Sequence, residues 1–263
     1  MSSSIQIDLQ EQTSGSVYWL TVSRPERLNA IDSNLVNELA TALGEVAIDE
    51  RARVVVLSSA GTKAWIAGAD LREMVDLNPQ SALDFIQGLH RVCTEIRELP
   101  VPVLARIDGF CLGAGLELAV SCDLRVASDD SRFGMPEVQV GLPSVIEAAL
   151  LPRLVGVGRA RDLVLTGRLV NAQEALTWGL VETVVPRESL DALVDERVAQ
   201  ILGAAPGAIR SQKRLCRQWE KLPLDEAIEA SIDVFTRAYE TDEPRTFMQR
   251  FLNRPRRERC RRK

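Results

Sequence analysis

Apolar residues recur along the chain in two patterns, short continuous runs and repeats with helical spacing. The continuous runs are bounded by polar or glycine-containing stretches, which is typical of buried strands, and they cover residues 17–22, 54–57, 103–107 and 124–127. Between the first two runs, Leu35, Leu39, Leu43 and Val46 repeat at the spacing of one helical face. Strands that alternate with helices predict an α/β fold of repeated β-β-α units around a largely parallel sheet.

This alternation stops near Pro186. Helical repeats follow it at residues 191–202, 206–219, 224–239 and 244–252. We therefore predict a β-β-α core over residues 1–185, which carries the candidate site, and a C-terminal helical region with a basic tail over residues 186–263. We find no internal repeat or low-complexity linker that would require independently folding domains.

Two glutamates, Glu117 and Glu137, stand twenty residues apart in segments that would confine a carboxylate. The run 103–107 leads into a glycine-rich turn, and a mostly apolar helix begins near Ala114, which puts Glu117 in the first helical turn. The helix dipole favours a carboxylate there, but the apolar flanks predict burial, so the pKa of Glu117 should be movable. Alone, such a glutamate is more often a capping or dipole partner.

Glu137 follows Pro136 in a segment that predicts a short extended stretch, a proline turn and a brief helical start. A glutamate after proline is most often a solvated residue at a helix N-terminus. The two glutamates are more informative together, because two carboxyl groups near one water molecule cannot both ionise cheaply and would titrate as a coupled pair.

A third segment, residues 63–74, places the small residues Ala67, Gly68 and Ala69 between the run 54–57 and a predicted helix. Backbone N–H groups at such a strand-to-helix turn lack partners. This turn and the glycine-rich turn before Glu117 could each direct one N–H to a single oxygen atom and so form an oxyanion hole.

These segments together resemble the signature segments of the crotonase superfamily, the enoyl-CoA hydratase/isomerase family. The resemblance extends from about residue 17 to about residue 253. It rests on residues 24–31, 67–71, 109–119, 122–123, 133–137 and 165–181. It implies a crotonase-like fold whose C-terminal helices close active sites and build a homotrimer or a hexamer.

The resemblance also implies a reaction, the hydration of 2-trans-enoyl-CoA thioesters to 3-hydroxyacyl-CoA. Glu117 and Glu137 match the glutamates that hold the attacking water, with Glu117 mainly activating water and Glu137 mainly supplying the α-proton. The backbone N–H groups of Ala69 and Ala114 match those that bind the thioester oxygen. Ala114 stands where the family more often has glycine, and a backbone contact tolerates its methyl group if it points away.

The resemblance further assigns residues to substrate or coenzyme A binding. These are Arg27, Leu28, Ala30, Ala67, Gly68, Asp70, Leu71, Gly113, Pro136, Gly141 and Ser144. Arg27 would meet the nucleotide end of coenzyme A, although it could also be a surface residue of a turn after Pro25. Coenzyme A is part of the substrate, so no separate cofactor is implied.

One loop departs from the family pattern, because residues 142–149 are less glycine-rich and one residue shorter than usual. Ser144 or Glu147 could recognise a polar substituent on the acyl chain, or Glu147 could be a third acid in another reaction, such as double-bond isomerisation or C–C bond hydrolysis. The Ser-x-x-Glu spacing also fits a capping box at the start of a helix, which we favour.

Composition narrows the chemistry further. The chain has 263 residues, 46% of them apolar, which is enough for one sizeable core. Its five cysteines lack C-x-x-C spacing, which favours reduced thiols and argues against zinc. The only histidine, His90, falls in a predicted polar helix over residues 81–98, where a surface or interface role is expected. Without a second histidine, the chain has few residues that could form a metal-ligand cluster or support most Ser-His-Asp mechanisms. We therefore predict no metal site.

The two ends of the chain bear on location and partners. The first twelve residues include acids and no arginine, and no apolar run approaches membrane-spanning length, which predicts a cytoplasmic protein without membrane contact. Residues 254–263 carry a charge of +6 against −11 for the remainder. Because no aromatic residue lies among these arginines, a solvated tail is favoured over nucleic-acid binding, and a non-catalytic RNA-binding protein is the least favoured alternative.

Overall fold

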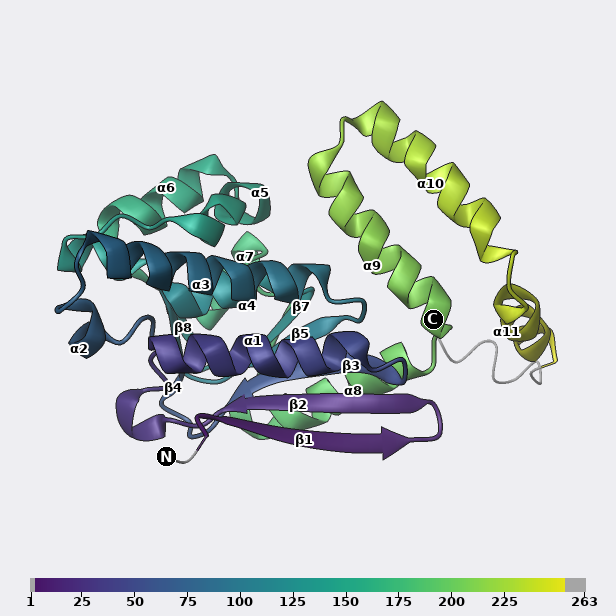
Figure 1. Cartoon of the computed structure of the whole chain (residues 1–263), viewed down its shortest axis with the longest axis horizontal. Coiled ribbons are helices and arrows are strands. Elements are labelled where there is room, and N and C mark those ends of the chain that lie inside the picture. The colour runs from purple at the N-terminus through teal and green to yellow at the C-terminus, as the bar shows by residue number, and fades with distance from the viewer. Residues whose placement is uncertain (1–2, 254–263) are drawn as a thin grey trace.

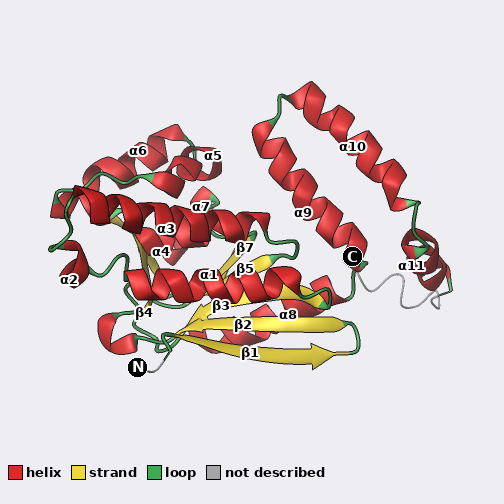
Figure 2. Ribbon diagram, in the orientation of Figure 1, coloured by secondary structure: helices red, strands yellow, loops and turns green. Residues whose placement is uncertain are grey.

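A computed structural model describes residues 3–253, and its main sheet has six strands in the order β1-β2-β3-β5-β7-β10. β1 and β2 form an antiparallel hairpin, and all other neighbours are parallel. The strands are β1 (Ile5–Gln12), β2 (Gly15–Val22), β3 (Ala52–Ser59), β5 (Val103–Ile107), β7 (Leu124–Ser128) and β10 (Thr183–Val185). The predicted α/β fold with a largely parallel sheet is confirmed (Figure 2).

Helices cover both faces of this sheet. Val55 and Leu57 of β3 belong to the larger core, which includes residues of α1 (Ser33–Ile48) and α3 (Pro79–Glu98), the two helices drawn over the strands in Figure 1. Val54 and Val56 belong to a smaller core with α8 (Leu190–Leu202). Every residue of β3 is buried for this reason, which explains its unbroken apolar run.

A second sheet positions the candidate site. It has four strands in the order β4 (Ala64–Ile66), β6 (Phe110–Leu112), β8 (Arg132–Gly134) and β9 (Leu169–Asn171). β4, β6 and β8 are parallel neighbours, and each follows a strand of the main sheet along the chain. The helical segments after them are α2 (Leu71–Met74), α4 (Ala114–Ser121) and η2 (Pro136–Val140). The repeated β-β-α units are therefore confirmed, and their three following turns meet at one edge.

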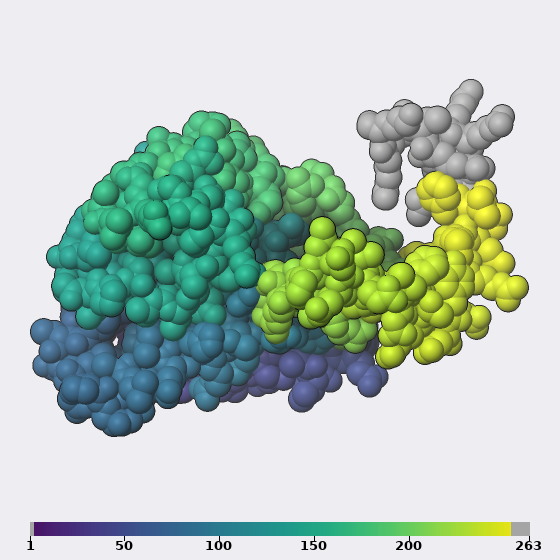
Figure 3. All heavy atoms as spheres, turned by 90° about the horizontal axis from the view of Figure 1, so that it is seen from above, coloured from purple at the N-terminus to yellow at the C-terminus, as the bar shows by residue number. Residues whose placement is uncertain are grey.

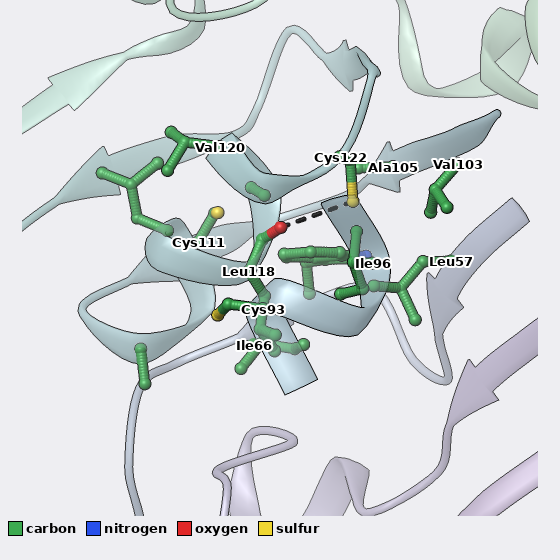
Figure 4. Packing of buried hydrophobic residues seen from close by; sticks show 14 of the residues in the cluster. Leu57, Ile66, Cys93, Ile96, Val103, Ala105, Cys111, Leu118, Val120 and Cys122 are labelled. Carbon is green, nitrogen blue, oxygen red and sulfur yellow. Dashed lines mark hydrogen bonds between the residues drawn. The ribbon is translucent and has the colours of Figure 1, made fainter. Parts of the chain in front are cut away.

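Helix α4 lies in the centre of the larger core. All eight of its residues are buried. Figure 4 shows Leu118 of this helix, and Cys122 directly after its end, among Cys93 and Ile96 of α3 and Val103 and Ala105 of β5. The Cys122 thiol donates to the Leu118 carbonyl of the helix, over 3.4 Å. The central position of α4 gives Glu117 a fixed and dry surrounding.

The remaining helical segments lie mostly in the second half of the chain. They are η1 (Pro25–Arg27), η3 (Ile146–Leu150), α5 (Leu151–Val155), α6 (Val157–Thr166), α7 (Ala172–Trp178), η4 (Arg187–Ser189), α9 (Pro206–Lys221), α10 (Leu224–Ala238) and α11 (Glu243–Leu252). The four predicted C-terminal helices correspond to α8–α11. Figures 1 and 3 show α9–α11 extending from the core as an arm, anchored by the buried Lys213, whose ammonium group lies 2.7 Å from Asp123.

Two predictions about secondary structure need correction. β1 was not predicted, because it is an edge strand with an exposed face and its Ile7 and Leu9 alternate with polar residues. Helix α3 is not polar throughout, because it buries Phe85, Leu89 and Ile96 among other residues. Their spacing marks one apolar helical face, so the signal was present in the sequence.

The predicted tail 254–263 lies outside the described residues, and the division at residues 185 and 186 stays a prediction.

Candidate active site

The glycine-rich turn after β6 sets the position of Glu117. Gly113 has a φ of +51°, a conformation that residues with a side chain rarely adopt. Gly115 lies so close to β4 that an added Cβ would stand 2.3 Å from the Ile66 carbonyl oxygen. Helix α4 can therefore start directly after β6 and pack against β4, which places Glu117 in its first turn, as predicted.

Glu117 is buried, with 4% of its surface exposed. Its Oε1 accepts a hydrogen bond from the backbone N–H of Ala148, over 3.2 Å. Burial is the largest influence on its pKa, and together with the nearby charges of Glu137 and Glu147 it outweighs the Ala148 N–H and raises the pKa of Glu117 to about 8. The predicted burial is confirmed, and the raised pKa is in the direction that burial of this carboxyl group leads us to expect.

Glu137 lies in η2, the short helical turn after β8, as predicted. It is half-buried, and its Oε2 accepts a hydrogen bond from the Ser144 hydroxyl over 2.7 Å. Its Oε1 lies close to Gly113, since a Cβ added to that glycine would stand 2.6 Å from this oxygen. The absence of a side chain at residue 113 therefore leaves room for the second carboxylate beside the start of α4.

Both glutamates line one cavity of about 530 Å³. The lining also includes the predicted site residues Ala67, Gly68, Ala69, Leu71, Gly113, Ala114 and Pro136. The rest of the lining is almost entirely apolar and comprises Met74, Leu77, Pro79, Ala82, Leu83, Phe85, Ile86, Leu89, Gln139, Val140, Leu142, Pro143 and Val145. The two carboxyl groups therefore face an apolar space large enough for an organic ligand.

The backbone N–H groups of Ala69 and Ala114 stand at the starts of two neighbouring units. Ala114 is the first residue of α4, and Ala69 follows β4 shortly before α2. Within residues 3–253, neither N–H donates to a backbone or side-chain acceptor. Each turn thus offers an unpaired donor beside the same cavity, which could bind an oxygen that gains negative charge.

The sequence matches known proteins over almost its whole length. A profile of the enoyl-CoA hydratase/isomerase family matches residues 12–258. The chain belongs to this family. It is 35% identical to the short-chain-enoyl-CoA hydratase of Clostridium acetobutylicum over 239 residues, 90% of this chain and 92% of that protein. It is 33% identical to the crotonyl-CoA hydratase of Syntrophomonas wolfei over 234 residues, 89% of this chain and 90% of that protein.

Solved structures of the family share the fold. The crystal structure of an enoyl-CoA hydratase from Bacillus anthracis matches with a TM-score of 0.90 and 31% identity, covering 95% of this chain and 96% of that one. The crotonase-like fold inferred from the sequence motifs is therefore confirmed.

Several residues assigned to substrate or coenzyme A binding are not part of the cavity lining. These are Arg27, Leu28, Ala30, Asp70, Gly141 and Ser144. Backbone hydrogen bonds from Ala67 to Leu28 and from Ile31 to Gly68 hold the segment after η1 against the Ala67–Ala69 turn. Asp70 is buried, caps α2 and lies 3.0 Å from the Arg27 guanidinium group. Its carboxylate is thus engaged within the protein, while the half-exposed Arg27 still borders solvent.

The capping box predicted for Ser144 and Glu147 is wrong. The helical turn η3 is preceded by Val145, and no side chain caps it. Ser144 instead donates to Glu137, and Glu147 is buried with 3% of its surface exposed. The sequence spacing failed because the loop folds over the site and its polar side chains bind partners distant in sequence.

Sequence reasoning missed two contributions to the site. Leu83, Phe85, Ile86 and Leu89 of α3 line the cavity, and their helical spacing was the available signal. The backbone N–H of Ala148 holds Glu117, and no sequence signal marks a donor of this kind. His90, expected at the surface, is exposed and also contacts Glu147.

Three further observations concern possible metal ligands, the cysteines and the helices of the described residues. Within them, no group of three or more histidine, cysteine, aspartate or glutamate side chains is arranged to hold a metal ion. Cys93, Cys111, Cys122 and Cys216 are free thiols, while Cys260 lies outside the described residues. None of the helices within residues 3–253 combines the length and apolar character that crossing a bilayer requires.

Proposed function

We propose that this protein hydrates 2-trans-enoyl-CoA thioesters to 3-hydroxyacyl-CoA, with Glu117 and Glu137 as the catalytic acids. The observation that supports the proposal is that Glu117, Glu137, Ala69 and Ala114 all line one apolar cavity, and that within residues 3–253 neither alanine N–H has a protein acceptor. Family membership and relatives named as hydratases support the same reaction. The reaction needs no cofactor beyond the coenzyme A of the substrate.

In the proposed reaction, the two glutamates transfer protons. Water held between the carboxyl groups attacks the β-carbon, a C–O bond forms, and the π electrons move onto the thioester oxygen as an enolate. Ionised Glu117 accepts a proton from water, and Glu137 gives a proton to the α-carbon. The net change is the addition of one water molecule. The two acids exchange protonation states, so a proton returns from Glu117 to Glu137 before the next turnover.

The N–H groups of Ala69 and Ala114 stabilise the enolate oxygen. Charge develops on this oxygen only as water attacks, so donors fixed beforehand lower the barrier more than they strengthen substrate binding. In a dry site, the loss of one such donor costs on the order of 3 kcal/mol of barrier. The apolar lining supplies this dry environment.

The lining also indicates the class of acyl group. Within the described lining, Glu117 and Glu137 are the only charged side chains, and the surfaces from α3 and from Leu142, Pro143 and Val145 are apolar. A carboxylated acyl chain would be buried there without a cation, at a high desolvation cost. We therefore assign apolar acyl groups to this cavity. A panel of linear, branched and carboxylated enoyl-CoA esters tests this, and a preference for the carboxylated ester would contradict it.

We also propose that the protein assembles as a homotrimer or as a hexamer made from trimers. The arm α9–α11 exposes large apolar side chains, namely Leu224, Ile228, Ile232, Phe235, Tyr239, Met248, Phe251 and Leu252. Large apolar side chains that gather on an exposed surface mark interaction sites. Sedimentation equilibrium measures the mass directly, and a monomer at micromolar concentration would rule the assembly out. The cytoplasmic location stays a prediction from the sequence.

A spectrophotometric assay with crotonyl-CoA tests the function. The wild-type protein should consume the enoyl absorbance, whereas Glu117→Gln and Glu137→Gln should not. Glu188→Gln, an exposed glutamate in η4, is the control for removal of one charge and should stay active. If the wild type shifts 3-enoyl to 2-enoyl thioesters without hydrating them, isomerisation replaces our proposal.

The pH dependence tests whether the two acids work as a pair. The mechanism needs one ionised and one protonated carboxyl group, so the pair must hold a single proton, and kcat/KM should fall as pH rises through about 8, the pKa of Glu117. A rise through the same pH range would instead mean that the active form has both carboxyl groups ionised, which contradicts the proposed proton transfer.

A further inference from the structure

Glu147 is a third buried carboxylate beside the site. Its side chain is 3% exposed, and it belongs to the loop that departs from the family pattern. Val145 lines the cavity but Glu147 does not. The residue therefore has no access to a bound substrate, and any effect on the reaction must pass through another group.

Three side chains of α3 surround the Glu147 carboxylate. The Nδ1 of His90 lies 3.0 Å from Oε1 and 3.2 Å from Oε2, and the guanidinium group of Arg97 lies 3.9 Å from Oε1. Burial, followed by the charge on Glu147, raises the pKa of the neighbouring Cys93 thiol well above its usual value. The imidazole of His90 is half-exposed, so it connects a buried acid to solvent.

Glu147 is also coupled to Glu117 through the backbone. The residue after it, Ala148, donates the N–H that binds the Glu117 carboxylate over 3.2 Å. The residue before it, Ile146, has a φ of +37°, which is unfavourable for a β-branched residue. Such strain persists only where surrounding contacts determine the conformation, and the contacts of Glu147 with α3 can do so.

We propose that Glu147, held by His90 and Arg97, is a positioning residue for Glu117. It fixes the η3 turn whose Ala148 N–H binds the Glu117 carboxylate, and it places a negative charge behind that carboxylate. This inference rests on the proposed hydration, in which Glu117 accepts the proton from water.

The two effects act on Glu117 in opposite directions. The Ala148 N–H favours the ionised form of Glu117, and the charge on Glu147 favours the protonated form. Other charged or titratable groups contact this region from every packed element. Glu137 faces it from η2, Cys93, His90 and Arg97 face it from α3, Glu220 of α9 pairs with Arg97, and Arg153 of α5 donates to the Glu220 carbonyl.

The pH profile of kcat/KM isolates the charge of Glu147. Glu147→Gln keeps the shape and an oxygen that can accept from His90, but it removes the charge. It should move the limb due to Glu117 to lower pH by about half a unit. Arg97→Gln removes a cation from the same carboxylate and should move the limb to higher pH. Asp84→Asn removes an exposed charge from the same helix and should leave it in place.

The single histidine gives a second readout that does not depend on activity. In a tag-free protein labelled with 15N-histidine, the Nδ1 signal of His90 reports its hydrogen bond to Glu147 directly. Glu147→Ala should shift this signal toward that of a free imidazole and lower kcat by about tenfold through the loosened turn. Asp84→Asn should keep the wild-type signal, and thermal unfolding checks that each variant is folded.

Three results would overturn the inference. They are a limb unchanged by Glu147→Gln, shifts of the same sign for Glu147→Gln and Arg97→Gln, or a His90 signal that is the same with and without the Glu147 side chain. Each can be observed in a protein that hydrates crotonyl-CoA normally. A wild-type protein without hydratase activity would instead refute the proposed function, and the His90 signal would still test the contact.

Discussion

The two segments that carry the acids of the site are built in contrasting ways. Helix α4 is buried at all eight positions, and backbone packing against β4 fixes Glu117 within it. The segment from η2 to η3 is largely exposed, and side-chain contacts shape it, from Ser144 to Glu137 and from His90 to Glu147.

The difference gives two identical side chains different environments. Glu117 takes its proton affinity from burial, which the fold maintains at a cost in stability. Glu137 is held by one hydroxyl group in a half-exposed turn, so its position depends on that hydrogen bond. Changes in α4 should therefore affect folding and catalysis together, whereas changes in the exposed segment should affect mainly catalysis.

The largest expected effect is the loss of activity when either candidate acid is replaced. Glu117→Gln and Glu137→Gln should each lower kcat for crotonyl-CoA by about a thousandfold, because each removes proton transfer without removing the substrate cavity. The double variant should be little worse than either single variant, since the acids act as a unit. Steady-state kinetics checks this, and multiplied losses would show that the two acids act independently.

The next effect is the pH dependence of stability that the buried Glu117 should cause. Glu117 has a pKa of about 8 in the folded protein and the ordinary glutamate value of 4.5 when unfolded. Between these values the folded state binds a proton that the unfolded state has released, so stability falls as pH rises from about 4.5 to about 8. The free energy of unfolding of the wild type, relative to Glu117→Gln, should fall by about 4 kcal/mol across this range.

Urea unfolding at several pH values measures that difference. The contributions of other titrating groups to the free energy of unfolding cancel when the two proteins are compared at the same pH. A constant difference between them would mean that Glu117 is ionised throughout in the folded protein, which contradicts the effect of burial.

A smaller effect tests the close packing of the α4 backbone against β4. Gly115→Ala should lower the free energy of unfolding by about 2 kcal/mol, because the added Cβ meets the Ile66 carbonyl oxygen and forces α4 away from β4. Gly158→Ala in α6 is a matched control, since nothing lies within 4 Å of its added Cβ. Chemical unfolding of both variants checks the difference, and equal stabilities would show that α4 is not closely packed.

The smallest effect concerns the exposed segment. Ser144→Ala removes the hydroxyl group that holds Glu137 and should lower kcat about fivefold, or about 1 kcal/mol, with little change in the free energy of unfolding. Ser144→Thr keeps a hydroxyl group and should restore most of the activity. A loss of stability comparable to that of Gly115→Ala would contradict the division between the two segments.

Patterns within single segments predicted much of the fold. The apolar runs marked β2, β3, β5 and β7 because strands covered on both faces exclude polar residues. The start of α4 at Ala114 and the burial of Glu117 followed from a glycine-rich turn before an apolar helix. The short strands β4, β6, β9 and β10 were too brief for such a pattern, and β1 is an exposed edge.

The amino-acid sequence thus determined the family, the repeated units and the burial of one acid, because motifs and apolar periodicity are local properties that the chain carries wherever it folds. Only the tertiary structure decided which partners the loop residues chose. Ser144 and Glu147 had the spacing of a capping box, yet they bind Glu137 and His90, residues brought near by the packing of η3 against α3 and α4. A buried carboxylate takes whichever donors surround it in space, and spacing along the chain does not encode them.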